Sequence, residues 1–154
     1  MLLIRNQKDE AIKTAQYGIS LNPQYYEGYC RLAQFYYVLN DDKNMGAQLS
    51  KCINLGGLDT ITSDSLLKKA ITYYISQKDY ATALKLSEKQ AASSSDGNDW
   101  LNLAKLYLIN NDLTSALAAG QQAIRLDPSL TTAWNSILNT LKGLGSSTSS
   151  KVKK

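Results

Sequence analysis

The sequence predicts an all-α fold, built as a stack of antiparallel helix pairs. Two independent sets of landmark residues recur along the 154 residues with the same intervals, 33 to 38 residues long. The first set is Ala11, Met45, Ala83 and Ala116, and the second set is Tyr29, Leu67, Trp100 and Trp134. This self-similarity is typical of repeat proteins, in which each helix pair buries its apolar face by stacking on its neighbours.

Apolar periodicity defines the individual helices. The residues three positions beyond the second set are Leu32, Ala70, Leu103 and Ile137, and those seven positions beyond it are Tyr36, Tyr74, Tyr107 and Leu141. Apolar residues at this spacing form one face of a helix, which must be buried. We predict helices at about 8–21, 26–39, 44–55, 64–76, 80–92, 99–109, 113–126 and 130–143, with residues 1–5 as the stub of another helix.

Turn and capping residues separate these helices. Asp79 and Asp112 stand where an N-cap carboxylate would accept hydrogen bonds from unpaired backbone N–H groups. Pro23 and Pro128 lie between helices, where the missing N–H costs little. Residues 55–60 contain two glycines and lengthen one joint, which explains the longest interval.

The best copy of the repeat covers 97–128 and has the pattern W-x2-L-A-x2-Y…A…P. Its matching residues are Trp100, Leu103, Ala104, Tyr107, Ala116, Ala123 and Pro128. The pattern resembles the tetratricopeptide repeat, from which it departs at Gly120, where that family prefers a bulky aromatic residue. The resemblance implies a right-handed superhelical stack over residues 1–144. Its parts are a partial repeat at 1–23, repeats at 26–57, 64–97 and 97–128, and a final helix at 130–143. The Ser- and Lys-rich segment 145–154 is expected to be a disordered tail.

The composition argues against catalysis and against cofactor or metal binding. The chain has no histidine, the commonest general base and metal ligand. It has no glycine-rich phosphate-binding loop, and its acidic pairs near 41 and 96–99 fall at turns, where capping explains them better than metal binding. Cys30 and Cys52 match no metal or redox motif and are expected to be buried small hydrophobes. We therefore expect a protein that is not an enzyme.

The charge balance argues against nucleic acid. The formal net charge is +4, but three lysines lie in the tail, which leaves 14 basic against 13 acidic residues elsewhere. A nearly neutral body lacks the broad basic face of nucleic-acid-binding proteins. No apolar run is long enough to span a membrane.

The resemblance implies a concave groove lined by the first helix of each pair, where family members bind their partners. The expected groove residues are Gln34, Tyr37, Lys68, Thr72, Asn102, Lys105 and Asn135, with Cys30 beside them. Lys68 and Asn102 fit two places of a clamp that some members use for peptide C-termini. Other places of the clamp do not fit, so this mode is not favoured. Solvated polar residues on an exposed face remain the simpler interpretation of the set.

Three functions remain open. The first is a scaffold that binds a peptide or helix of another protein in the groove. The second is the soluble C-terminal appendage of a membrane protein similar to bacterial O-antigen ligases or polymerases. The third, less favoured, is helical-repeat RNA binding. The compartment is left open, with the cytoplasm as the default.

We also expect the chain to be part of a longer protein or of an oligomer. The helix at 8–21 has the pattern of a second helix, so Ile4, Ala11 and Ala15 would lack the cover of a first helix. The last helix, by contrast, has a polar outer face, as terminal repeats usually do.

Overall fold

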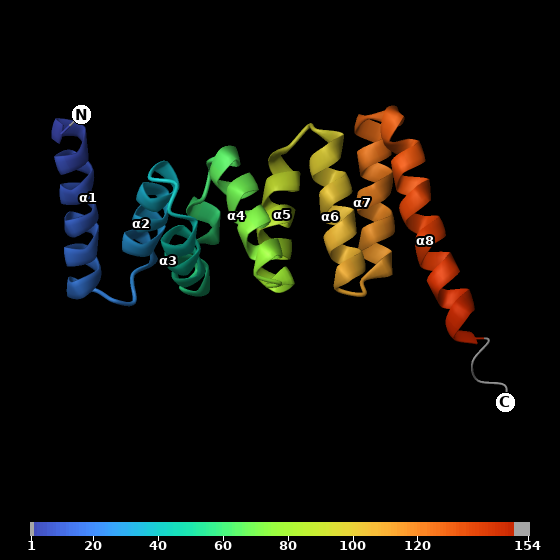
Figure 1. The fold of residues 1–154 in the computed structure, drawn as a ribbon, viewed down its shortest axis with the longest axis horizontal. Coiled ribbons are helices and arrows are strands. Elements are labelled where there is room, and N and C mark those ends of the chain that lie inside the picture. The colour runs from blue at the N-terminus through green and yellow to red at the C-terminus, as the bar shows by residue number, and fades with distance from the viewer. Residues whose placement is uncertain (1, 150–154) are drawn as a thin grey trace. The chain divides into compact units, whose positions relative to one another are not determined.

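The computed structural model describes the backbone of residues 2–149 and the side chains of residues 7–140. This span is all-α and contains no β-strand (Figure 1). The α-helices are α1 (Leu2–Leu21), α2 (Tyr26–Val38), α3 (Asp42–Asn54), α4 (Asp64–Ser76), α5 (Tyr80–Ser93), α6 (Gly97–Ile109), α7 (Leu113–Leu126) and α8 (Thr131–Ser149). Short 3-10 helices, η1 (Gly57–Thr60) and η2 (Pro128–Leu130), occupy two joints. The predicted fold class is confirmed, and each predicted helix is present.

Two helices extend beyond their predicted ends. α1 begins at Leu2, so residues 2–5 open this helix and do not end a separate one. α8 continues to Ser149, which makes residues 145–149 of the expected tail helical. Residues 150–154 lie outside the described residues. Extending an existing helix costs far less than starting one, so weak helix formers suffice at both ends.

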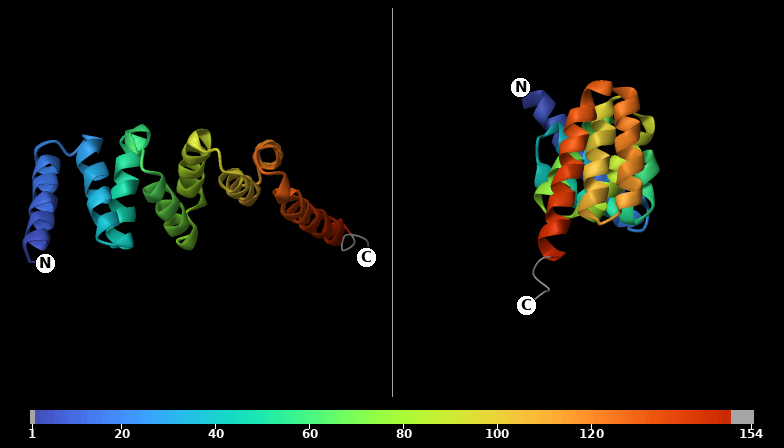
Figure 2. Two further views of the ribbon diagram at one scale, coloured as in Figure 1. Left: turned by 90° about the horizontal axis from the view of Figure 1, so that it is seen from above. Right: turned by 90° about the vertical axis from the view of Figure 1, so that its right-hand side faces the viewer.

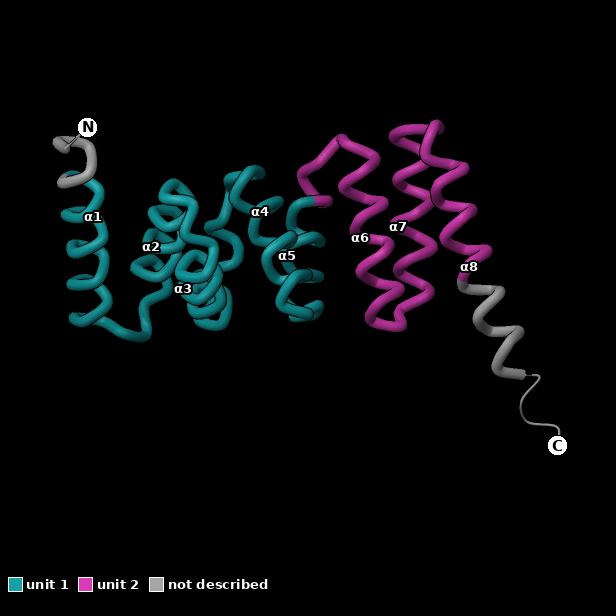
Figure 3. The backbone as a smooth tube through the Cα atoms, in the orientation of Figure 1, with its two compact units in different colours: residues 1–90 teal, residues 91–154 magenta. Residues whose placement is uncertain are grey.

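The helices form two compact units, residues 1–90 and residues 91–154 (Figure 3). In the first unit, α1 to α5 follow one another as neighbours that alternate in direction (Figures 1 and 2). In the second unit, α6 and α7 form an antiparallel pair, and η2 leads from α7 into α8.

The same backbone turn joins the two helices of each pair. Asn40, Lys78 and Asn111 have left-handed φ angles of 57°, 60° and 62°. The next amide in each copy donates to a tyrosine carbonyl at 2.9 Å: Asp41 to Tyr36, Asp79 to Tyr74, and Asp112 to Tyr107. A left-handed residue followed by this long-range bond is the Schellman ending of a helix. The repeat read from side chains is therefore also a repeat of the backbone.

Carboxylates cap the helices that follow these turns. Asp79 accepts from the amide of Thr82 at 3.1 Å, and Asp112 accepts from the amide of Ser115 at 3.0 Å. The hydrogen bonds from Ser115 lower the pKa of Asp112, because they stabilise its charged form. Both predicted N-caps are confirmed.

Small residues allow the helices to approach closely. Ala83 and Ala116 have no exposed surface, as the prediction of close helix crossings requires. Ala11, at the equivalent position of α1, is only partly buried.

Ala83→Leu and Ala116→Leu are each expected to lower the free energy of unfolding by about 1–3 kcal/mol, because the extra atoms have no space. Ala118→Leu is the matched control, since Ala118 lies on α7 and is exposed. Denaturant unfolding measures all three variants. An unchanged midpoint for the buried substitutions would show that the helix pairing is misplaced.

The two tryptophans differ in burial. The Trp134 side chain is 3% exposed, whereas Trp100, which was expected to be buried, is only partly covered. The Trp100 indole N–H donates to the carbonyl of Ser94 at 3.3 Å, which keeps one edge of the ring near the surface. The Trp134 ring lies so close to Gly120 that a Cβ there would overlap it. Gly120 therefore replaces the family's aromatic residue because the indole of α8 fills that space.

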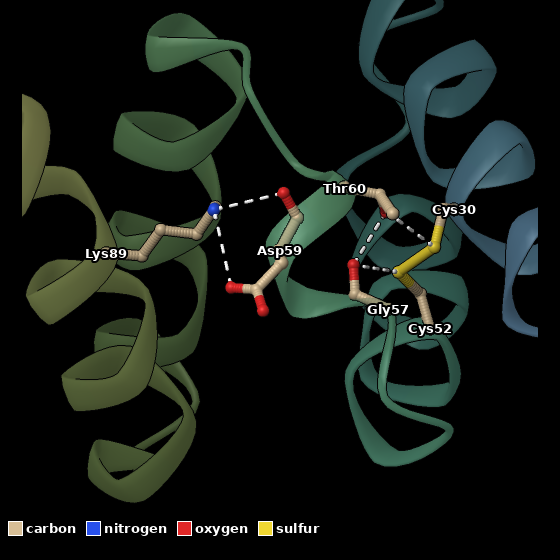
Figure 4. Close-up of a disulfide and its surroundings, with 6 residues drawn as sticks. All are labelled: Cys30, Cys52, Gly57, Asp59, Thr60 and Lys89. Carbon is tan, nitrogen blue, oxygen red and sulfur yellow. Dashed lines mark hydrogen bonds and ion pairs between the residues drawn. A yellow bond between two sulfur atoms is a disulfide. The ribbon is translucent and has the colours of Figure 1, made fainter.

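A disulfide joins Cys30 of α2 to Cys52 of α3, with the Cα atoms 5.1 Å apart (Figure 4). The predicted burial of both cysteines is confirmed, but the bond between them was not predicted. Spacing along the sequence does not reveal the pairing, because the antiparallel packing of α2 and α3 brings the two residues together. Gly57 of η1 lies against the disulfide, where a Cβ would meet the Cys30 sulfur at 2.7 Å. Gly56, before it, has a left-handed φ of 91° and lies between the C-cap of α3, Leu55, and η1.

Candidate functional site

In the first unit, the expected groove residues lie on the first helices of two pairs. Gln34 and Tyr37 belong to α2, and Lys68 and Thr72 belong to α4. Gln34, Lys68 and Thr72 are exposed, and Tyr37 is partly buried. Cys30 was expected beside them, but its burial in the disulfide removes it from any contact surface.

Lys69 connects the end of α2 with α4. Its ammonium group lies 2.9 Å from the Asp42 carboxylate, donates to the Asn40 side-chain oxygen at 3.0 Å, and stands 5.7 Å from the centre of the Tyr37 ring. A cation over an aromatic face is attractive and holds the ring in place. Sequence reasoning missed this role of Lys69, because the contact joins residues about 30 positions apart.

Lys68 belongs to a small polar cluster formed by side chains of α4 and α5. Its ammonium group lies 3.1 Å from the Asp64 carboxylate, one helical turn earlier. The Gln90 side chain of α5 also donates to Asp64 at 3.1 Å. The hydrogen bond from Gln90, followed by that from Lys68, lowers the pKa of Asp64. Lys68 is thus held in place along α4, with its side chain about half exposed.

In the second unit, Asn102 and Lys105 lie one turn apart on α6, and Asn135 lies on α8. All three are exposed. The Lys105 ammonium donates to the Asn102 side-chain oxygen at 3.2 Å. The structure therefore brings Asn102 and Lys105 together as one polar patch. Asn102, Lys105 and Asn135 all belong to the second unit.

A cleft of about 720 Å³ lies between α1 and α2 in the first unit. The residues of α1 that line it include the small residues Ala11, Ala15 and Gly18. Glu27 and Arg31 of α2 border it and form an exposed ion pair of 3.9 Å. The sequence predicted an uncovered face at Ala11 and Ala15, but Ala15 is only 9% exposed because α2 lies on that side.

The described part of the chain shows neither a candidate metal centre nor a candidate membrane span. Its residues include no group of three or more His, Cys, Asp or Glu side chains placed to hold a metal ion. None of its helices is long and apolar enough to cross a membrane.

Comparisons with known proteins give a fold likeness. No protein-family model matches the sequence, and no curated protein sequence matches it. Among solved structures, the chain is similar to a crystal structure of MamA, with 17% identity, coverage of 92% of this chain and 81% of that chain, and a TM-score of 0.52. It is also similar to a 41-end form of MamA from Desulfovibrio magneticus RS-1 (20% identity, 82% and 70% coverage, TM-score 0.47). A third similarity is to a thermophilic TPR protein of Thermus thermophilus (19% identity, 88% and 75% coverage, TM-score 0.48).

Three observations agree on one architecture: the repeated helix pairs, their common Schellman turns, and the likeness to the first MamA structure. The chain has the tetratricopeptide-repeat fold.

Proposed function

We propose that this chain is a protein-interaction scaffold that binds a peptide or helix of another protein along the first helices of its repeats. The observation that carries the proposal is the contrast within these helices. In α6, Leu101, Leu103 and Leu106 are buried, while Asn102 and Lys105 on the same helix are exposed and joined by a hydrogen bond. Exposed amide and ammonium groups on a rigid helix can read the carbonyl and carboxylate groups of a peptide.

The test compares a groove variant with a matched control. Lys68→Glu, Asn102→Glu and Lys105→Glu together are expected to weaken capture of the native partner at least tenfold, while the helical signal stays intact. The control carries Lys85→Glu, Gln121→Glu and Arg125→Glu, which make the same charge change at exposed positions of α5 and α7. Partner binding is measured by quantitative affinity purification with each purified chain. A folded groove variant that binds as well as the control would refute the groove assignment.

Two alternatives remain. The chain could bind RNA, or it could be the soluble appendage of a membrane protein. RNA is less favoured because the charge outside the tail is nearly balanced. Salt-dependent RNA binding by the purified chain would restore it. The appendage would be favoured by membrane-spanning segments encoded just upstream of Met1.

The disulfide supports a proposal about the compartment. Disulfides persist in oxidising compartments and are rare in the reducing cytosol. We propose that this chain acts in an oxidising compartment, in place of the cytoplasmic default. Mass spectrometry of native protein trapped with an alkylating reagent should show Cys30 and Cys52 protected from alkylation. Alkylation of both thiols would contradict this placement.

A further inference from the structure

The joint between α3 and α4, residues 55–63, packs on the disulfide. Within this joint only Gly57 and Ile61 are buried. A Cβ at Gly57 would lie 2.7 Å from the Cys30 sulfur and 2.9 Å from the Cys52 carbonyl oxygen, so η1 and the bond leave no space between them. Figure 4 shows Gly57 and Thr60 of η1 beside the two sulfur atoms. The disulfide is therefore part of the surface on which η1 rests.

Polar contacts also link η1 to both sulfur atoms. The Thr60 hydroxyl donates to the Gly57 carbonyl oxygen at 2.7 Å and lies 3.6 Å from the Cys30 sulfur (Figure 4). The same carbonyl oxygen lies 3.6 Å from the Cys52 sulfur. A sulfur in a disulfide has no proton to donate, whereas a thiol is a weak donor. The Gly57 carbonyl therefore has a neighbour whose hydrogen-bonding capacity changes with its redox state.

Lys89 of α5 holds η1 from the side opposite the disulfide (Figure 4). Its ammonium group donates to the Asp59 carbonyl oxygen at 3.2 Å and lies 3.8 Å from the Asp59 carboxylate. The Asp59 side chain is fully exposed, so the ion pair itself contributes little. The hydrogen bond to the carbonyl is the contact that fixes the backbone of η1.

The two ends of the joint are held in different ways. Gly56 is exposed and has a left-handed φ of 91°, which glycine adopts without strain, so this end is suited to be a hinge. Ile61 is 2% exposed, and the Ser63 side chain caps α4 by accepting from the Leu66 amide at 3.3 Å. Since α4 has its own anchors, η1 is the part of the joint that depends on the disulfide.

We infer that the Cys30–Cys52 disulfide and η1 form a redox-sensitive joint, in which reduction of the bond releases η1 from α2 and α3. Two separate thiols need more room than a bonded pair, and the packing at Gly57 leaves them none. The new Cys52 thiol also competes with Thr60 for the Gly57 carbonyl oxygen. Released η1 loses its contact with Lys89, so the change reaches α5. This joint is separate from the groove residues of the proposed function.

The chemical step is thiol–disulfide exchange with a dithiol. A thiolate of the dithiol attacks the sulfur of Cys30, which is 8% exposed, in preference to that of Cys52, which has no exposed surface. A mixed disulfide forms at Cys30, and Cys52 leaves as a thiolate that takes up a proton. The second thiolate of the reagent then attacks its own sulfur in the mixed disulfide, which releases Cys30 as a second thiol. Two electrons and two protons pass from the dithiol to the cysteines, and the reverse exchange restores the bond.

Hydrogen exchange of the full chain, with and without dithiothreitol, tests the release. Amides of residues 57–61, among them the Ile61 amide that donates to the Leu58 carbonyl at 3.2 Å, should exchange at least tenfold faster after reduction. Amides of α2 and α3 should stay slower than those of the joint, because the joint opens locally while the helices remain folded. Unchanged exchange in residues 57–61 would overturn the inference. Exchange of the joint, α2 and α3 at one common rate in the reduced chain would also overturn it, since the bond would then only staple the helix pair.

A variant of η1 tests the coupling in the opposite direction. Thr60→Ala leaves the disulfide in place but removes the hydroxyl that bonds to Gly57 and lies over the Cys30 sulfur. Dithiothreitol is expected to reduce this variant at least threefold faster than the native chain, because η1 opens more often and exposes the sulfur. Thr62→Ala is the matched control, since Thr62 is exposed and lies outside η1. Equal rates of reduction for the two variants would show that η1 does not respond to the bond and would overturn the inference.

Discussion

Replacing Trp134 with alanine is expected to lower the free energy of unfolding by about 3–5 kcal/mol, the usual cost of removing a buried aromatic side chain. The indole is 3% exposed and lies against Gly120, where no side chain from α7 could fill the space it leaves. The loss would therefore include both the burial of the ring and a residual cavity. Chemical denaturation followed by circular dichroism measures the change.

Trp100→Ala is the comparison for this variant. Trp100 is only partly buried, so its substitution is expected to cost less than that of Trp134. Gly120→Ala should also destabilise the chain, although alanine favours helices, because its Cβ would overlap the Trp134 ring. If Trp100→Ala proved the more damaging of the two tryptophan substitutions, the packing of α8 on α7 would be wrong.

Removing the disulfide is expected to have the second large effect. The Cys30–Cys52 bond closes a loop across 22 residues. A cross-link over a loop of this length restricts the unfolded chain and typically stabilises the folded state by about 3 kcal/mol. Reduction, or the double substitution Cys30→Ser and Cys52→Ser, should therefore lower the melting temperature.

The double substitution also provides the control for the reducing agent. Reductant should lower the melting temperature of the native chain and leave that of the doubly substituted chain unchanged, because only the native chain has a bond to break. Equal melting temperatures for the oxidised and reduced native chain would show that α2 and α3 are held together without the bond.

The sequence predicted the helices closely because their signals are local. Apolar spacing placed α4 and α7 at their observed ends, and Asp79 and Asp112 cap the helices that they were expected to cap. The burial of Ala83 and Ala116 also followed from their recurrence at one register.

Features that depend on packing were harder to predict. Predicting the disulfide requires knowing which faces of α2 and α3 meet, and the spacing of the cysteines along the chain does not give that information. The different burial of Trp100 and Trp134 depends on neighbours: Trp134 has the space above Gly120, while the Trp100 edge bonds to the loop at Ser94. The start of α1 was missed because the apolar residues at 2–4 were assigned to a separate helix.

The candidate site was predicted in part. Exposure of Gln34, Lys68, Thr72, Asn102, Lys105 and Asn135 agrees with a surface role, whereas their part in partner binding stays a prediction. The uncovered face of α1 was expected from the second-helix pattern at Ala11. The cleft beside it depends on the position of α2, which only the structure gives.

Hydrogen exchange of the unbound chain tests the central claim most directly, namely that the described helices cover α1 less completely than they cover the equivalent helices α3, α5 and α7. In a chain verified as monomeric, amides of residues 8–21 are expected to exchange faster than those of α3, α5 and α7, because less apolar packing protects them. Exchange in residues 8–21 as slow as that in residues 99–126 would contradict this claim.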